Sequence, residues 1–155
     1  MRFRRSLLPL WVVLSTVLFA APALNAQTGA PFDSALARRL GADRIGMKVY
    51  VMAFLKKGPN RNQDSVEAAR LQTAHLANIG RMAEEGSLVL AGPFMDDGDV
   101  RGIYVFNVTS VEEARALTAT DPAIKAGRLV MELHPWYGSA ALMEVNRIHN
   151  TLQRP

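Results

Sequence analysis

The sequence predicts an α+β fold, a four-stranded antiparallel sheet with two helices in the order β-α-β-β-α-β. Four short runs rich in branched and aromatic residues have the composition of strands. Stretches with helical periodicity follow the first and the third of these runs. An Asp-Gly turn signal separates the second run from the third, as expected of a hairpin. This order is that of the ferredoxin-like fold, and it occupies residues 46–138 of the 155.

The first half of this order is a strand followed by a long helix. Residues 47–55, MKVYVMAFL, form a dense run of strand formers. Residues 56–63 contain a Gly-Pro pair and predict a loop. Residues 64–85 then predict a helix that is capped by Asp64 or Ser65 and ended by the glycine that follows.

The second half begins with a predicted hairpin. Its strands are residues 87–92, SLVLAG, and residues 101–108, RGIYVFNV, and the turn is MDDGD at 95–99. Ser110 is the predicted cap of a helix over residues 111–119.

A short helical turn and a last strand complete the domain. The turn begins at Asp121 and Pro122, because proline is well tolerated at the first helical position. Residues 128–134, RLVMELH, predict the fourth strand, and residues 139–155 form a C-terminal tail.

The first and third strands are apolar on both faces of the predicted sheet. Their alternating positions fall into two sets, Val49, Val51, Ala53 and Leu55 against Tyr50, Met52 and Phe54 in the first strand, and Ile103 and Val105 against Tyr104, Phe106 and Val108 in the third. Two helices cover only one face, so we expect a second copy of the sheet to cover the other in a two-fold homodimer. The alternative cover is a tail helix carrying Leu142, Val145, His149 and Leu152. We expect Glu at Tyr104 or Phe106 to weaken association, or to destabilise the fold if that side of the strand instead faces the helices.

Residues 1–26 have the layout of a secretory signal peptide, with a basic start, an apolar stretch and small residues at the end. The apolar stretch is shorter than the roughly 20 residues that span a bilayer, and an uncleaved membrane anchor is the alternative. Cleavage after Ala26 or Ala23 would give a periplasmic or secreted protein with no membrane attachment. Residues 27–45 are then a polar extension with a short helix after Asp33. The chain contains no cysteine, so its core must hold the fold together without disulfides.

The charge of the chain gives little support to nucleic-acid binding. The 18 Lys and Arg residues outnumber the 14 Asp and Glu residues, but Arg2, Arg4 and Arg5 lie in the predicted leader. The remainder therefore carries 15 basic and 14 acidic residues and is almost neutral. Electrostatic capture of DNA, RNA or an anionic membrane is not expected.

Metal and cofactor chemistry lack their usual sequence signals. The three histidines, His75, His134 and His149, fall on different elements without paired spacing. The aspartates around Gly98 lack the spacing of a calcium loop and indicate an acidic turn. No glycine-rich phosphate loop follows a strand, and no serine lies in a nucleophile elbow. We therefore expect neither a metal nor a cofactor.

His75 stands out on the long helix. A helical wheel places Glu67, Arg70, Asn78, Arg81, Glu84 and Glu85 on one side and Ala69, Leu71, Leu76, Ile79, Met82 and Ala83 on the other. His75 falls in the apolar arc, where its ring must find a hydrogen-bond partner or lose its solvation. A hydrogen-bonded core histidine and a functional histidine both fit. Asp121 before Pro122 fits a helix cap, and a capping carboxylate can also hold an imidazole.

The order and spacing of several short motifs resemble the YCII-related (YciI-like) family over residues 47–138. The motifs are His75 in AHLANI, LVLAGPF at 88–94 after a helix ending in EEG, EEA at 112–114 before Asp121-Pro122-Ala123, and KAGRL at 125–129 leading into HPW at 134–136. The resemblance implies a dimeric α+β barrel and a His-Asp active-site pair that matches His75 and Asp121. Ala123 stands where family members often carry Phe, which implies a wider or reshaped pocket. The leader and the tail after Gly138 also depart from the shortest members.

The resemblance and the residues together suggest a cofactor-free enzyme. His75 would be the general acid or base and Asp121 would orient its ring. Gly92 and Pro93 would shape one wall of a substrate pocket between sheet and helices. The expected chemistry is isomerisation, elimination (including dehalogenation) or lactone chemistry on a small organic molecule. The alternatives are a non-catalytic small-molecule-binding module and a periplasmic interaction protein.

Overall fold

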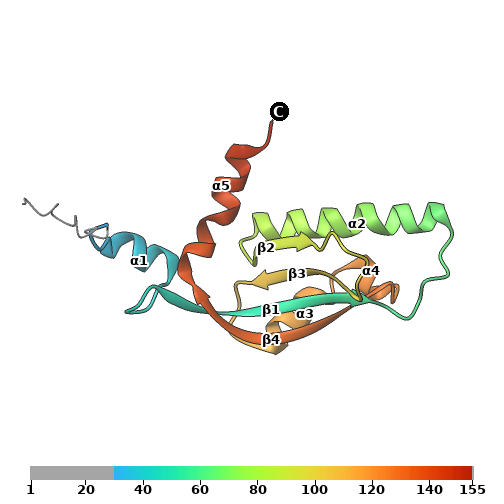
Figure 1. Ribbon diagram of the computed structural model, residues 1–155, viewed down its shortest axis with the longest axis horizontal. Coiled ribbons are helices and arrows are strands. Elements are labelled where there is room, and N and C mark those ends of the chain that lie inside the picture. Colours follow the sequence, from blue (N-terminus) through green and yellow to red (C-terminus); the bar gives the residue numbers. More distant parts are fainter. Residues whose placement is uncertain (1–29, 155) are drawn as a thin grey trace, which may run out of the picture. The chain divides into compact units, whose positions relative to one another are not determined.

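The computed structural model describes residues 30–154, so the predicted leader and its cleavage sites lie outside the described part. Figure 1 shows the elements in chain order. They are α1 (Ser34–Leu40), β1 (Met47–Lys57), α2 (Ser65–Glu84), β2 (Leu88–Pro93), β3 (Val100–Phe106), α3 (Val111–Thr118), α4 (Pro122–Lys125), β4 (Leu129–Ser139), the 3-10 helix η1 (Ala140–Glu144) and α5 (Val145–Leu152). No helix within residues 30–154 is both long and apolar enough to cross a bilayer.

The sheet has the strand order β2-β3-β1-β4, with antiparallel pairing throughout. The two strands that precede the main helices, β1 and β3, are the central pair, and β2 and β4 form the edges. This is the ferredoxin-like arrangement, so the predicted α+β fold is confirmed.

The helices begin where the sequence places capping side chains. Asp64 accepts the backbone N–H of Glu67 at 2.8 Å and begins α2. Ser110 and Glu113 form a reciprocal capping box at the start of α3. Gly86, with a φ of 74°, takes the left-handed conformation that ends α2 and turns the chain into β2.

The fourth strand is longer than predicted. It continues past residue 134 to Ser139, because β1 pairs with it along its whole length, from Met47 opposite Ser139 to Lys57 opposite Leu129. The sequence predicts that this strand ends at residue 134, before Pro135. An edge strand tolerates a proline, because one row of its backbone groups has no partner strand.

One face of the sheet packs on the helices. Its buried residues include Val51, Ala53 and Leu55 from β1 and Tyr104 and Phe106 from β3, in contact with Met82 of α2 and Ala114 of α3. The helix-facing set therefore contains Tyr104 and Phe106, and a charge at either position would enter the core rather than an intermolecular surface.

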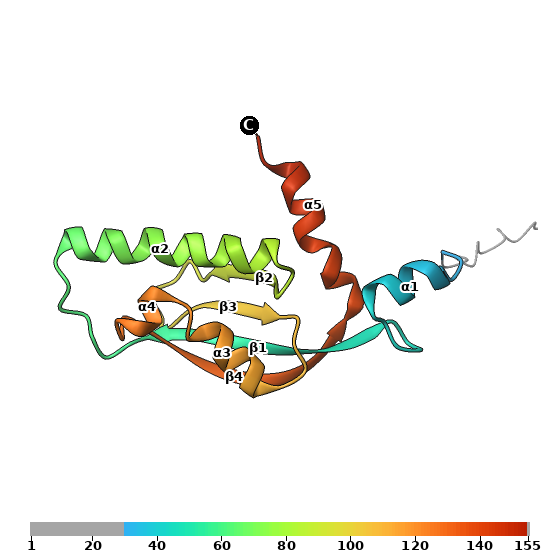
Figure 2. The same cartoon turned by 180° about the vertical axis from the view of Figure 1, so that it is seen from behind.

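The other face is covered only in part. Tyr50, Val89 and Val105 are buried there, beneath a group of side chains that includes Trp136, Leu142 and Met143. The tail thus contributes to the cover only through η1, which carries Leu142 and Met143, whereas α5, which carries Val145, His149 and Leu152, has no buried residue. Figures 1 and 2 show that α5 rises from the end of the sheet that lies opposite to α4. Phe54 and Ile103 remain half-exposed outside this cluster.

Candidate active site

His75 lies on the buried side of α2, between Leu71 and Met82 in the helical stripe that meets the core. Only 7% of its surface is exposed. Three assignments of the helical wheel are wrong, and one of them is Ala69, which is exposed. Asn78 is buried, because Arg81 and Thr120 satisfy its amide oxygen by hydrogen bonds. Leu76 is 56% exposed.

Asp121 is fully buried at the start of α4 and is the hydrogen-bond partner of His75. Its Oδ2 lies 2.6 Å from His75 Nδ1. Its Oδ1 accepts the backbone N–H of Ala123 at 2.8 Å, which caps the helix. The two oxygens thus provide both contacts that the sequence suggested, a helix cap and an imidazole partner.

The phenol of Tyr104 lies on the other side of the same imidazole. Its Oη is 3.3 Å from His75 Nε2, and the two rings are stacked with an interplanar angle of 21°. Burial, reinforced by the charge of Asp121, raises the pKa of Tyr104 well above its ordinary range, so the hydroxyl stays protonated. Because Asp121 accepts from Nδ1, the neutral ring keeps a lone pair on Nε2, which can accept from Tyr104.

The sequence pattern places Tyr104 in the sheet and does not mark it as a residue of the site. The signal that could have identified Tyr104 is a tyrosine among otherwise apolar strand residues, because a buried hydroxyl group needs a hydrogen-bond partner. The register of β3 against β1 places it opposite Ala53, on the face that meets α2. Strand pairing of this kind could not be read from a local motif.

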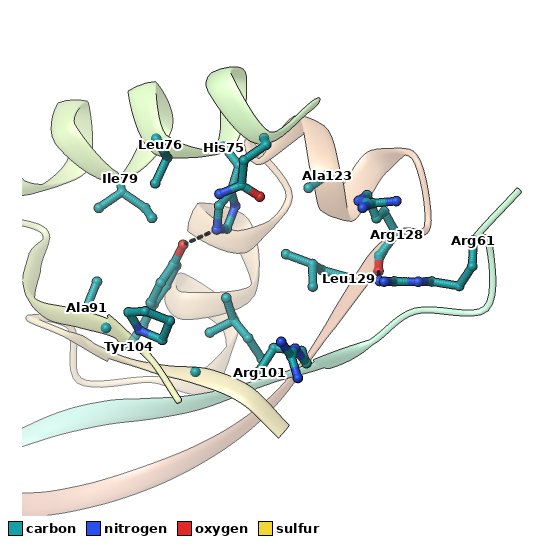
Figure 3. Close-up of a pocket in the computed structure, with 15 residues that line it drawn as sticks. Arg61, His75, Leu76, Ile79, Ala91, Arg101, Tyr104, Ala123, Arg128 and Leu129 are labelled. Atoms are coloured by element: carbon teal, nitrogen blue, oxygen red, sulfur yellow. Dashed lines mark hydrogen bonds between the residues drawn. The ribbon is translucent and has the colours of Figure 1, made fainter. Parts of the chain in front are cut away.

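A cavity of about 480 Å³ opens beside the imidazole. Figure 3 draws the residues that line it. His75 and Tyr104 contribute to its wall, and Gly92, Pro93 and Ala123 also line it. Gly102 is part of the same wall, where a Cβ atom would lie 2.5 Å from the carbonyl oxygen of Gly92. Such a volume suits a small organic ligand.

The remaining candidates for metal binding do not gather. Within residues 30–154 no three His, Asp or Glu side chains form a group that could hold a metal ion. His134 Nε2 lies 2.8 Å from a carboxylate oxygen of Glu132, and His149 lies on α5. Asp96 accepts the backbone N–H of Gly98 at 3.2 Å, which is a contact within the hairpin turn.

The fold and the site define a ferredoxin-like protein with a buried His-Asp pair beside a pocket. The family model of the YCII-related domain matches residues 49–137, and the chain belongs to this family. A similar solved structure is 5-chloro-2-hydroxyhydroquinone dehydrochlorinase (TftG) from Burkholderia phenoliruptrix AC1100 in complex with 2,5-dihydroxybenzoquinone. It has 20% sequence identity and a TM-score of 0.42, covering 57% of this chain and 93% of that one. A search of curated proteins found no match.

Proposed function

We propose that this protein is an acid–base enzyme that isomerises a small organic molecule or eliminates a leaving group from it. The observation that carries the proposal is the 2.6 Å contact between His75 and the fully buried Asp121, beside a pocket that His75 lines. A carboxylate on Nδ1 fixes the ring orientation and stabilises the imidazolium that forms when Nε2 takes a proton.

In the proposed reaction, His75 Nε2 removes a proton from a carbon of the bound substrate. The electron pair of the broken C–H bond forms a new double bond. In an isomerisation the imidazolium returns the proton to a different carbon, and in an elimination the leaving group departs with its bonding pair. In the substrate complex the protonated phenol of Tyr104 would donate to a substrate oxygen on which negative charge develops, instead of to Nε2 as in the free protein. This exchange leaves the Nε2 lone pair free to take the proton.

The test uses the mature protein and a panel of small cyclic ketones, lactones and halogenated hydroxyaromatics. Loss of substrate and exchange of carbon-bound hydrogen in D₂O are followed by NMR, since exchange reports proton abstraction even where no product accumulates. We expect His75→Ala to lower the rate at least about 100-fold, the ordinary contribution of a general base.

His149→Ala is the matched control, because it removes the same side chain from α5. It should leave the rate and the urea midpoint of unfolding unchanged. His75→Ala should still unfold cooperatively, at a lower urea concentration, because the buried Asp121 loses its imidazole partner. Full activity in His75→Ala would refute the proposal. Saturable binding across the panel without exchange or turnover would instead support the non-catalytic binding module.

A further inference from the structure

Three arginines converge on the pocket that holds His75. Arg61 comes from the loop between β1 and α2, Arg101 from β3, and Arg128 from the residue just before β4. Figure 3 shows them together on one side of the pocket, with His75 and Tyr104 on the other. Among residues 30–154, those that line the pocket include no Asp or Glu side chain.

Neutral groups hold each guanidinium in place. Arg128 Nη1 donates to the side-chain oxygen of Gln63 at 3.0 Å, and Arg61 Nη1 donates to the carbonyl oxygen of Arg128 at 3.3 Å. Arg101 Nη1 donates to two carbonyl oxygens of the hairpin turn, at 3.0 and 3.3 Å. In each arginine, one nitrogen therefore makes the hydrogen bonds that position the side chain, and the acceptors of these bonds are neutral.

Half of the other arginines in the described chain have glutamate partners. Arg39, Arg70, Arg81 and Arg147 pair with glutamates at 2.6–2.9 Å, whereas the described residues place no carboxylate within 4.0 Å of Arg38, Arg44, Arg115 or Arg154. No carboxylate of the described residues lies within 4.0 Å of Arg61 or Arg128, and Arg101 has only the fully exposed Asp97, at 4.0 Å. Positive charge thus accumulates at the pocket, because three guanidinium groups meet there and no described carboxylate lies closer to them than 4.0 Å.

We propose that the ligand of this pocket is a small organic carboxylate whose anionic group is bound by Arg61, Arg101 and Arg128. Guanidinium groups form paired, charge-assisted hydrogen bonds with a carboxylate, and an anion relieves the repulsion among three cations. Leu55, Ile79 and Leu129 supply the apolar wall that a hydrocarbon ring or chain would contact.

This proposal names a substrate class for the proposed acid–base enzyme. It rests on the proposed function only where it assigns the carbon that loses a proton. With its carboxylate at the arginines, the substrate presents its other end to Nε2 of His75. Removal of a proton there spreads negative charge through the conjugated part of the substrate. Preorganised guanidinium groups then stabilise that charge.

The test compares two probes of nearly equal shape, benzoate and its neutral analogue benzamide, by calorimetry on the mature protein. We expect benzoate to bind at least about tenfold more tightly, which corresponds to about 1.4 kcal/mol. Arg128→Gln and Arg61→Gln should each reduce this preference about fivefold or more, because each removes one charge–charge contact. Arg101 is left intact because it also holds the hairpin turn.

Arg115→Gln is the matched control, since it removes the same charge from an exposed position on α3 that does not line the pocket. It should preserve the preference for benzoate. His75→Ala should also bind benzoate, so a failure of the acid–base proposal leaves this one standing. Equal affinity for the two probes, absence of saturable benzoate binding, or an unchanged preference in both arginine variants would overturn it.

Discussion

The carboxylate of Asp121 serves two neighbours at once. One oxygen accepts the backbone N–H of Ala123, and the other accepts the imidazole N–H of His75. Asparagine preserves the first contact, because its amide oxygen is an equally good cap. Its amide N–H group, however, would face the N–H at Nδ1 of the imidazole, and two donors cannot form a hydrogen bond with each other. The ring hydrogen must then move to Nε2, and the lone pair that faces the pocket is lost.

We therefore expect Asp121→Asn to fold normally and to lose at least about 100-fold in turnover. Asp33→Asn is the control, because it makes the same exchange at the N-cap of α1. Turnover and urea unfolding are measured for both variants. Wild-type turnover in Asp121→Asn would show that the carboxylate acts only as a cap.

Tyr104 is a buried phenol that resists ionisation in the folded protein. Burial first, and then the charge of Asp121, raises its pKa above the ordinary value of 10.0. The unfolded chain releases this proton near pH 10, whereas the folded chain keeps it. The associated stability is therefore complete below about pH 10 and is lost as the pH rises further.

Above about pH 10, we expect the free energy of unfolding of the wild type to fall more steeply than that of Tyr104→Phe. The two slopes should differ by up to about 1.4 kcal/mol per pH unit, the value for one proton. Tyr50, whose pKa burial also raises, is present in both proteins and cancels in the comparison. Urea unfolding between about pH 8 and about pH 11 gives the curves, and parallel curves would contradict the expectation.

At the scale of elements, a polar cluster of Asn78, Arg81 and Thr120 connects α2 by hydrogen bonds to the segment that carries Asp121. The side-chain oxygen of Asn78 accepts from Arg81 at 2.9 Å and from the hydroxyl of Thr120 at 3.1 Å. Arg81 also donates to Thr120 at 3.1 Å. Thr120 directly precedes Asp121, so the cluster couples the position of the helix to that of the carboxylate.

Removal of the hydrogen bonds of this polar cluster should affect both stability and turnover. We expect Asn78→Ala to destabilise the fold by about 1–2 kcal/mol and to reduce turnover several-fold. Ser110→Ala is the matched control, because loss of the α3 cap has a similar cost of about 1 kcal/mol without touching the pocket. Thermal unfolding and turnover are compared. Equal turnover in the two variants would show that Asn78 does not position the site.

At the scale of the whole molecule, the second face of the sheet predicts a homodimer. The tail covers Tyr50 and Val105, while Phe54 and Ile103 stay half-exposed beside them. Such apolar residues at the centre of a sheet favour association with a second copy. We expect light scattering of the mature protein at micromolar concentration to give twice the monomer mass.

Phe54→Glu and Ile103→Glu should shift this mass towards that of the monomer, because each places a charge in the proposed interface. Val66→Glu is the control, since this residue is exposed on α2, which covers the opposite face. A monomeric wild type would refute the expectation. Glu at Tyr104 or Phe106 is unsuitable for the test, because both residues lie in the core.

The basic and apolar leader predicts that the mature chain starts near Gln27, in the periplasm or the medium. Intact-mass measurement of the protein from its native host checks this expectation. A chain that retains Met1 in the membrane fraction would contradict it and support the anchor alternative.

Local signals in the sequence were enough for the elements and for part of the site. Side-chain caps such as Asp64 and Ser110 act within one helical turn, so they are readable from neighbouring residues. Alternation along β1 divides its residues into two sets, because successive side chains point to opposite faces. His75 and Asp121 were identifiable as a polar residue in an apolar arc and as an aspartate before a proline.

Only the tertiary structure decided how these parts meet. Period-two alternation is symmetric, so it could not show that Tyr104 and Phe106 meet the helices. The long β1–β4 ladder extended a strand past Pro135, where local propensity ended it. The convergence of Arg61, Arg101 and Arg128 on the pocket of His75 has no local signature, since the four residues come from separate segments. Sequence determines the elements because their signals are short-range, whereas the pocket is set by strand order and register, which bring distant residues together.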